Sequence, residues 1–299
     1  MTFFNSVIIS ATVGMLFANN NNANSTENVN LNFNENGTTN VIAMTNDENF
    51  DLKLSNVSDP EFPPNCIHGV FSVSATKKVY FSCGNLQYNT ETQKYQFAEH
   101  QYDVIGDGGA NTGENGIRDL FGWGTWQEGK DPMLSETDDS KYFYDQSKLS
   151  TIGAEWTILN KEEWSYLKDR NGGTKIGTAR INDMNGLVIL PDTWKQPEGV
   201  TFKSGFTFEE DDEEAYPKNN KYTPEEWEKM EKAGAVFLPA TGWRFGTGLL
   251  KYNRYGVYWS STTIDEQGAY FIYVFSGGFG WYYGNRYYGE PVRLVQVIK

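Results

Sequence analysis

The stretch Thr223-Pro-Glu-Glu-Trp-Glu-Lys-Met-Glu-Lys-Ala-Gly-Ala-Val-Phe-Leu-Pro239 predicts a short helix that leads directly into a short strand. Thr223 is suited to cap the helix, Pro224 to occupy its first position, and Glu226 to complete a capping box. The glycine of this stretch ends the helix, and the apolar run after it ends at the final proline. We expect Trp227 to be the buried anchor of the helix.

An earlier stretch, Asn160-Lys-Glu-Glu-Trp164, repeats the pattern. Asn160 is a suitable cap, and Glu163 stands three residues later as its capping-box partner. Trp164 and Leu167 are expected to face inward, and Gly172 can close the helix. The sequence therefore predicts two short helices, each with a tryptophan four positions after its cap.

Most of the remaining apolar residues occur in short runs bounded by glycine, proline or polar residues, which is typical of strands and loops. These runs are residues 69–74, 78–82, 186–190, 235–238, 257–260, 269–275 and 292–298. Two helices among many short strands indicate an α+β fold. Because strands and helices do not alternate regularly, we do not expect a parallel sheet.

The first 58 residues differ from the rest of the chain, so we predict two parts, residues 1–58 and 59–299. Residues 19–40 hold eleven asparagines and are expected to be a tether unless a partner orders them. Val7–Phe17 is apolar and has two interpretations: a signal peptide, although residues 1–6 lack Lys and Arg, or a segment that attaches the protein to a larger assembly. Prolines near residue 60 mark the start of the main domain.

The composition argues against two classes of partner. The 299-residue chain has a formal net charge of −14, which repels nucleic acid and anionic membrane surfaces. Residues 209–214 form one acidic run, interpreted as a solvated loop or a site for a divalent cation. Aromatic residues make up 15% of the chain, enough to place some on the surface, where Tyr and Trp suit recognition.

Cys66 and Cys83 are the only cysteines, and they flank the hairpin predicted by residues 69–82. They should therefore lie near its open end. A disulfide in an oxidising compartment and two free thiols both remain open.

Taken in order, eleven motifs resemble one family, the Fibrobacter succinogenes major paralogous domain family of gut Bacteroidales and their phages. They are Gly69-Val-Phe-Ser-Val-Ser74, Val79-Tyr-Phe-Ser-Cys-Gly-Asn-Leu-Gln-Tyr88, Phe97-Ala-Glu99, Gln101-Tyr-Asp103, Leu120-Phe-Gly-Trp-Gly-Thr125, Glu162-Glu-Trp-Ser-Tyr-Leu167, Leu190-Pro-Asp192, Tyr222-Thr-Pro-Glu-Glu-Trp227, Gly234-Ala-Val-Phe-Leu-Pro-Ala-Thr-Gly242, Tyr258-Trp-Ser-Ser-Thr262 and Pro291-Val-Arg-Leu-Val295. The resemblance spans about residues 66–299. It implies a C-type-lectin-like fold in its formylglycine-generating-enzyme variant, with two helices, short twisted antiparallel sheets and long loops.

The resemblance also implies a function. Some relatives are variable proteins of diversity-generating retroelements, in which the last sheet and its loops contact the ligand, and trimeric phage tail tips are among them. This implies an extracellular protein on a bacterial cell surface or a phage virion, as a homotrimer or attached through residues 1–58. The enzymes of this fold use a late cysteine pair, which this chain lacks, so we do not expect an enzyme.

The stretch Tyr270–Gly289 is the candidate binding face. It holds ten aromatic residues, five glycines and one base, and no acid. Residues 270–275 alternate as a central strand with two apolar faces, whereas the glycines from Gly277 onward predict an irregular turn. Tyrosine, glycine and asparagine resemble the composition of antibody paratopes. The predicted ligand-binding residues are Tyr273, Phe279, Trp281, Tyr282, Tyr283, Asn285, Arg286, Tyr287 and Tyr288, with a cell-surface protein or a glycan as ligand.

Other features have weaker alternatives. Trp123, Trp126 and Trp243 could stack on sugar rings, as in a carbohydrate-binding fimbrial adhesin, although the motif that holds the first two favours the core. Loop residues 107–114, with Asp107, Asn111 and Glu114, could bind Ca²⁺ but are interpreted as a flexible loop; no other cofactor is expected. His68 and His100 have no Ser or Asp partner at a motif spacing, so neither indicates catalysis.

Overall fold

The computed structural model describes residues 28–33, 39–44, 62–111, 115–124, 156–206, 220–246 and 248–299. The chain divides into two compact units, Met1–Glu61 and Phe62–Lys299. In the first unit, β1 (Asn28–Phe33) pairs antiparallel with β2 (Thr39–Met44). Residues 28–33, within the segment expected to be a tether unless a partner orders it, thus form a strand. Three apolar residues alternate there with asparagines, which is the period of a strand, and the asparagine-rich composition obscured it.

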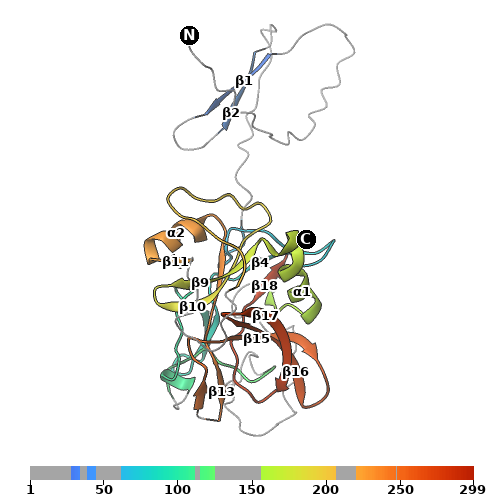
Figure 1. Ribbon diagram of the computed structural model, residues 1–299. Helices are drawn as coiled ribbons and strands as arrows, with labels where there is room; N and C mark the ends of the chain where they lie inside the picture. The colour runs from blue at the N-terminus through green and yellow to red at the C-terminus, as the bar shows by residue number, and fades with distance from the viewer. Residues whose placement is uncertain are drawn as a thin grey trace. The chain divides into compact units, whose positions relative to one another are not determined.

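The second unit holds two α-helices within its described residues, α1 (Lys161–Asp169) and α2 (Pro224–Lys232) (Figure 1). Asn160 and Thr223 are their caps, and both capping boxes are formed as predicted. Trp164 and Trp227 are each only 1% exposed, which confirms them as buried anchors. A 3-10 turn continues α1 over Arg170–Gly173, and another spans Gly109–Asn111.

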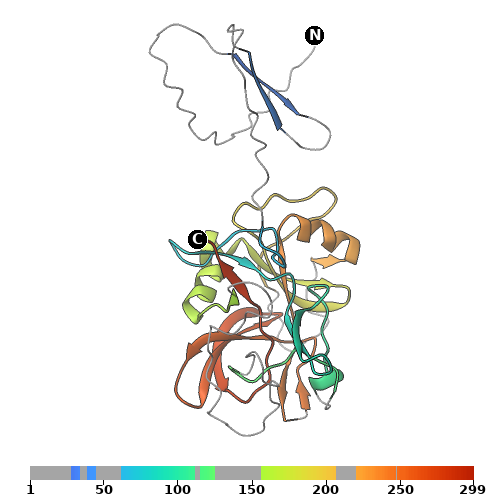
Figure 2. The same cartoon turned by 180° about the vertical axis from the view of Figure 1, so that it is seen from behind.

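Short sheets make up most of the second unit (Figures 1 and 2). One four-stranded sheet has the order β11 (Lys221–Tyr222), β9 (Ile176–Ile181), β10 (Met184–Ile189) and β12 (Val236–Pro239). Another has the order β3 (Phe71–Ser72), β4 (Lys78–Phe81), β18 (Val295–Val297) and β8 (Trp156–Thr157). β6 (Lys94–Phe97), β5 (Leu86–Asn89) and β7 (Ile117–Arg118) form a three-stranded sheet, and β13 (Trp243–Phe245) pairs with β14 (Gly248–Leu250).

The sheet that concerns function consists of β15 (Gly256–Thr263), β16 (Gly268–Phe275) and β17 (Gly278–Asn285). All pairings in the second unit's described sheets are antiparallel except the two-residue contact of β11 with β9, which runs parallel. The predicted α+β class is thus confirmed at the level of short helices and small, mainly antiparallel sheets. The parallel contact of β11 with β9 was not expected.

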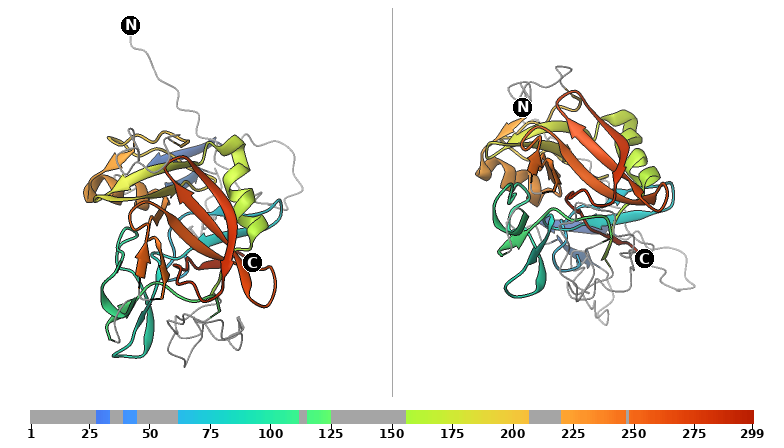
Figure 3. Two further views of the ribbon diagram at one scale, coloured as in Figure 1. Left: turned by 60° about the horizontal axis from the view of Figure 1, so that its bottom comes forward. Right: turned by 90° about the horizontal axis from the view of Figure 1, so that it is seen from below.

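Three groups of buried side chains form the core. Trp164 packs with Phe81 and Ile272 where α1 meets the C-terminal sheet, and Trp227 packs with Phe237 under α2. The third group surrounds Trp259 on the other side of the C-terminal sheet. Helix α1 lies against β15, β16 and β17 (Figure 3), so the tryptophan that anchors the helix also fixes its position beside this sheet.

Candidate recognition surface

Strand β16 is the central strand of its sheet, as its two apolar faces predicted. The expectation of an irregular Gly-rich turn is wrong, because β17 is a regular eight-residue strand paired with β16 along its whole length, from Phe275 opposite Gly278 to Gly268 opposite Asn285. The turn between the strands is only two residues long.

The glycines of β17 make this regular pairing possible. A Cβ on Gly280 would lie 3.0 Å from the ring of Tyr273, the residue directly opposite. A Cβ on Gly284 would lie 3.0 Å from the rings of Phe271 and Tyr288. Rings from neighbouring segments therefore occupy the space that side chains would fill, which is one of the recognised roles of glycine within a strand.

Five rings form the surface that we call the edge cluster: Tyr270, Phe271, Trp281, Tyr282 and Tyr283. Trp281, Tyr282 and Tyr283 are consecutive on β17 and 46%, 57% and 51% exposed. The rings of Tyr282 and Tyr283 stack at 4.9 Å, and Tyr270 meets Trp281 edge-on at 5.8 Å. Phe271 lies 6.2 Å from Tyr282. The cluster is thus one connected aromatic surface along the edge strand β17 and its neighbour β16.

Lys161, the first residue of α1, adds a positive charge to the edge cluster. Its Nζ lies 3.8 Å from the ring centre of Trp281 and 4.4 Å from that of Tyr270, within the range of cation–π attraction. Lys161 forms no ion pair with any residue that the structure describes.

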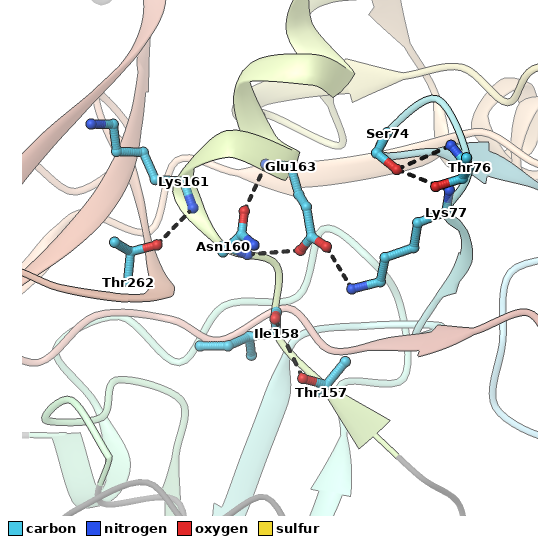
Figure 4. Close-up of polar contacts among 9 residues, drawn as sticks. All are labelled: Ser74, Thr76, Lys77, Thr157, Ile158, Asn160, Lys161, Glu163 and Thr262. Carbon is cyan, nitrogen blue, oxygen red and sulfur yellow. Dashed lines mark hydrogen bonds and ion pairs between the residues drawn. The ribbon is translucent and has the colours of Figure 1, made fainter.

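The start of α1 is fixed to the sheet by hydrogen bonds, which place Lys161. The Ser261 amide donates to the Leu159 carbonyl at 3.0 Å, and the Lys161 amide donates to Thr262 Oγ1 at 3.0 Å. Both partners lie where a bulge shifts the register of β15. Figure 4 shows Lys161 and Thr262 on one side of the helix start, with Glu163 bound to Lys77 on the other. Capping and bulge together direct Lys161 toward β16 and β17.

A second aromatic group adjoins the edge cluster across Gly284. Phe245, 49% exposed, contacts Tyr287 and Tyr288 at ring distances of 6.1 and 5.7 Å. Asn285 donates from Nδ2 to the Tyr287 hydroxyl at 2.8 Å. Three of the predicted site residues, Asn285, Tyr287 and Tyr288, are half-buried. They lie beside the exposed rings of residues 281–283 and are not part of that run.

Three further predicted residues lie elsewhere than expected. Phe279 is buried, because strand alternation puts it opposite Val274 on the core face. Arg286 is also buried: it donates to the carbonyls of Asp265 and Gly268, and its guanidinium lies 4.7 Å from the ring centre of Trp123. Through these two carbonyls it holds the β15–β16 turn to the base of the sheet.

Tyr273 is the third. It is half-buried, stacks on Phe275 at 5.6 Å and covers Gly280, so it belongs to the support of the surface.

Two buried acids lie on the chain segments that flank this sheet. Burial raises the pKa of Asp119 to about 6, although it accepts hydrogen bonds from the Ile105 amide and Asn111 Nδ2. Burial also raises the pKa of Glu290 well above its usual range, and neither of its carboxylate oxygens has a hydrogen-bond partner in the described part of the chain. Both acids favour the protonated form more than they would in water.

The alternative sites receive no support from the described residues. The amide of Asn111 is engaged by Gly106 and Asp119, while Glu114 and residues 209–214 lie outside the described residues. No group of three potential metal ligands occurs among the residues described. His68 and His100 stack on Phe62 and Tyr102.

Trp123, Trp243 and the two cysteines also lie off the edge cluster. Trp123 is buried, as its motif favoured, and donates from Nε1 to the Ser260 carbonyl. Trp243 is half-buried, and Trp126 lies outside the described residues. Cys66 and Cys83 are free thiols, and burial raises the pKa of Cys66 to about 12.

Sequence reasoning missed four residues. Tyr270 and Phe271 belong to the edge cluster, Lys161 lies over it, and Phe245 belongs to the adjoining aromatic group. Tyr270 lies within the stretch that drew attention and could have been found by pairing β16 with β17. Lys161 and Phe245 lie far from that stretch in sequence, so only the tertiary structure brings them to it.

Helices long and apolar enough to cross a bilayer do not occur in the described part of the chain. Comparison with models of protein families, with curated proteins and with solved structures finds no match to this chain.

Proposed function

We propose that the protein is a non-catalytic recognition module that binds a cell-surface protein or glycan through the edge cluster. The observation that carries the proposal is the run of three exposed rings at positions 281–283. Aromatic rings this exposed are usually avoided on a surface without a partner, and tryptophan and tyrosine are enriched among residues that dominate binding energy.

The support beneath the rings favours this proposal over an accidental exposure. Strand pairing, glycine–ring contacts and the buried Arg286 hold the surface in place, so little conformational entropy would be lost on binding. The C-type-lectin-like resemblance of residues 66–299 supports the same role, with the last sheet as ligand-contacting surface. Under this proposal the protein acts outside the cell, on a bacterial surface or a phage virion.

The test uses the full-length protein on an array of immobilised oligosaccharides and in selection from a displayed library of random twelve-residue peptides. We expect at least one of the two to yield binders that the double variant Trp281→Ala/Tyr283→Ala loses. Tyr252→Ala removes a ring that is 42% exposed outside the edge cluster and is the matched control. Binders that tolerate the double variant, or no binders in either format, would contradict the proposal.

A further inference from the structure

The outer edge of β17 presents unpaired backbone groups beside the edge cluster. The sheet order is β15–β16–β17, so β17 is an edge strand, and no described segment pairs with its free side. Such an edge is a template for another strand. Proteins usually blunt long edges with lysine, proline or a bulge, and β17 contains none of these: its register with β16 is unbroken.

The pairing with β16 determines which backbone groups face outward. The turn after Phe275 is two residues long, so the pair that flanks it, Phe275 and Gly278, must be hydrogen bonded. Hydrogen-bonded and non-hydrogen-bonded pairs alternate from there. The backbone of Tyr282 therefore faces β16, whereas Trp281 and Tyr283 direct their N–H and C=O groups to the free edge. The backbone groups available to a partner thus belong to two of the three exposed rings of β17.

Charge identifies the kind of segment that fits. Residues 268–289 contain no acid in a chain of net charge −14. The Lys161 ammonium lies over the Trp281 ring, on the face where a strand added beside Trp281 would place every second side chain. An acidic side chain there would form an ion pair partly shielded from water by the rings. A second copy of this edge would bring no acid to Lys161, so self-association is disfavoured.

We propose that β17 binds an extended segment of a partner protein by strand addition, with an acidic side chain of that segment paired to Lys161. This inference rests on the proposed recognition function and makes it specific: the ligand is an acidic, extended peptide. Main-chain hydrogen bonds supply the affinity, while the rings and Lys161 supply the selectivity.

The experiment separates the contribution of the β17 backbone to binding from the contribution of its rings. Peptides selected on the full-length protein are measured against Tyr283→Pro and Tyr283→Val. Both variants lack the ring, but only proline lacks the outward N–H, and proline is tolerated in an edge strand where that group faces solvent. We expect the proline variant to bind at least about tenfold more weakly than the valine variant, with a similar melting temperature.

A second measurement leaves the protein unchanged. N-methylation of alternate peptide amides should abolish binding for one set of positions and spare the other, since only every second amide of an added strand faces β17. Equal effects of the two sets, or of Tyr283→Pro and Tyr283→Val, would overturn strand addition.

The charge is tested by Lys161→Gln with Lys161→Arg as control. Lys161→Gln should weaken binding about fivefold or more at low salt, and Lys161→Arg should retain it. Replacing the peptide's acid by its amide should add nothing to Lys161→Gln. Selected peptides without an acid, or additive effects, would overturn the pairing. Binding of oligosaccharides alone, lost with Trp281→Ala/Tyr283→Ala, would overturn this inference while supporting the recognition function.

Discussion

Two helix-and-sheet regions of the second unit are built from the same local signals but differ in what they leave exposed. Helices α1 and α2 both have nine residues, a capping box and a tryptophan that is only 1% exposed. Under α2, every residue of β10 is buried. Beside α1, the edge strand β17 exposes three consecutive rings, and the first helical residue is Lys161 where α2 has Pro224. The same capping and anchoring residues thus build two similar helices. The candidate function depends instead on the strand that has no neighbour on one side, β17.

The largest expected loss of stability is the same for the two helix-and-sheet regions. Trp164→Ala and Trp227→Ala should each lower the free energy of unfolding by about 3–5 kcal/mol, because each leaves a cavity in the core. Urea denaturation of the two variants measures this. A loss in one region below half of that in the other would show that the two anchors are not equivalent.

A pH effect on stability is expected from two buried acids outside both helices: Asp119, which follows β7, and Glu290, which pairs with Phe121 beyond β17. Their folded pKa values are raised, so the folded state binds more protons than the unfolded chain above about pH 4, and stability falls as pH rises. The part due to Asp119 is lost by about pH 6 to 7, and the part due to Glu290 continues above that range.

Glu290→Gln isolates this effect. The variant should be more stable than the unmodified protein by about 1 kcal/mol or more at pH 8, and the difference should shrink toward pH 4. Unfolding curves at pH 4, 6 and 8 provide the measurement. A constant difference would mean that Glu290 ionises normally.

A smaller effect concerns the capping boxes. Asn160→Ala and Thr223→Ala should each cost about 1 kcal/mol. Glu163→Gln should cost more than Glu226→Gln, because Glu163 is buried and also pairs with Lys77 at 2.5 Å, whereas Glu226 is half-exposed. In a Lys77→Met background, Glu163→Gln should cost no more stability than Glu226→Gln. Equal costs would indicate that the ion pair adds nothing to the cap.

The smallest effect on stability is expected where the effect on binding should be largest. Trp281→Ala and Tyr283→Ala remove exposed rings and should change the free energy of unfolding by less than about 0.5 kcal/mol each. Comparison with Trp227→Ala in the same buffer gives the contrast directly. A loss comparable to that of Trp227→Ala would place these rings in the core energetics and remove the basis for a binding surface.

The sequence predicted those parts of the fold that depend on neighbouring residues. Caps, the end of α2 and the tryptophan anchors follow from spacing within one turn, and the central position of β16 follows from its two apolar faces. Helix α1 ends at Asp169, before the Gly172 that was expected to close it, because a 3-10 turn follows it. The regular strand structure of β17 could not be predicted, because rings from other segments fill the space beside its glycines. No pattern within the strand itself reveals these contacts. Once β17 is known to be a strand, the burial of Phe279 follows from alternation. The position of Lys161 over Trp281 depends on contacts between residues 120 positions apart and could not have been predicted.

In β17, rings of neighbouring residues fill the space beside two glycines, and this limits which positions of the surface can vary. Gly280 and Gly284 cannot accept a side chain without displacing Tyr273, Phe271 or Tyr288, so these positions are constrained by folding. Trp281, Tyr282 and Tyr283 lie between them and are about half exposed, so their replacement should cost the fold little. Under the proposed recognition function, three adjacent codons can therefore be rewritten to change specificity while the fold is retained. Such a surface can follow a changing target one residue at a time.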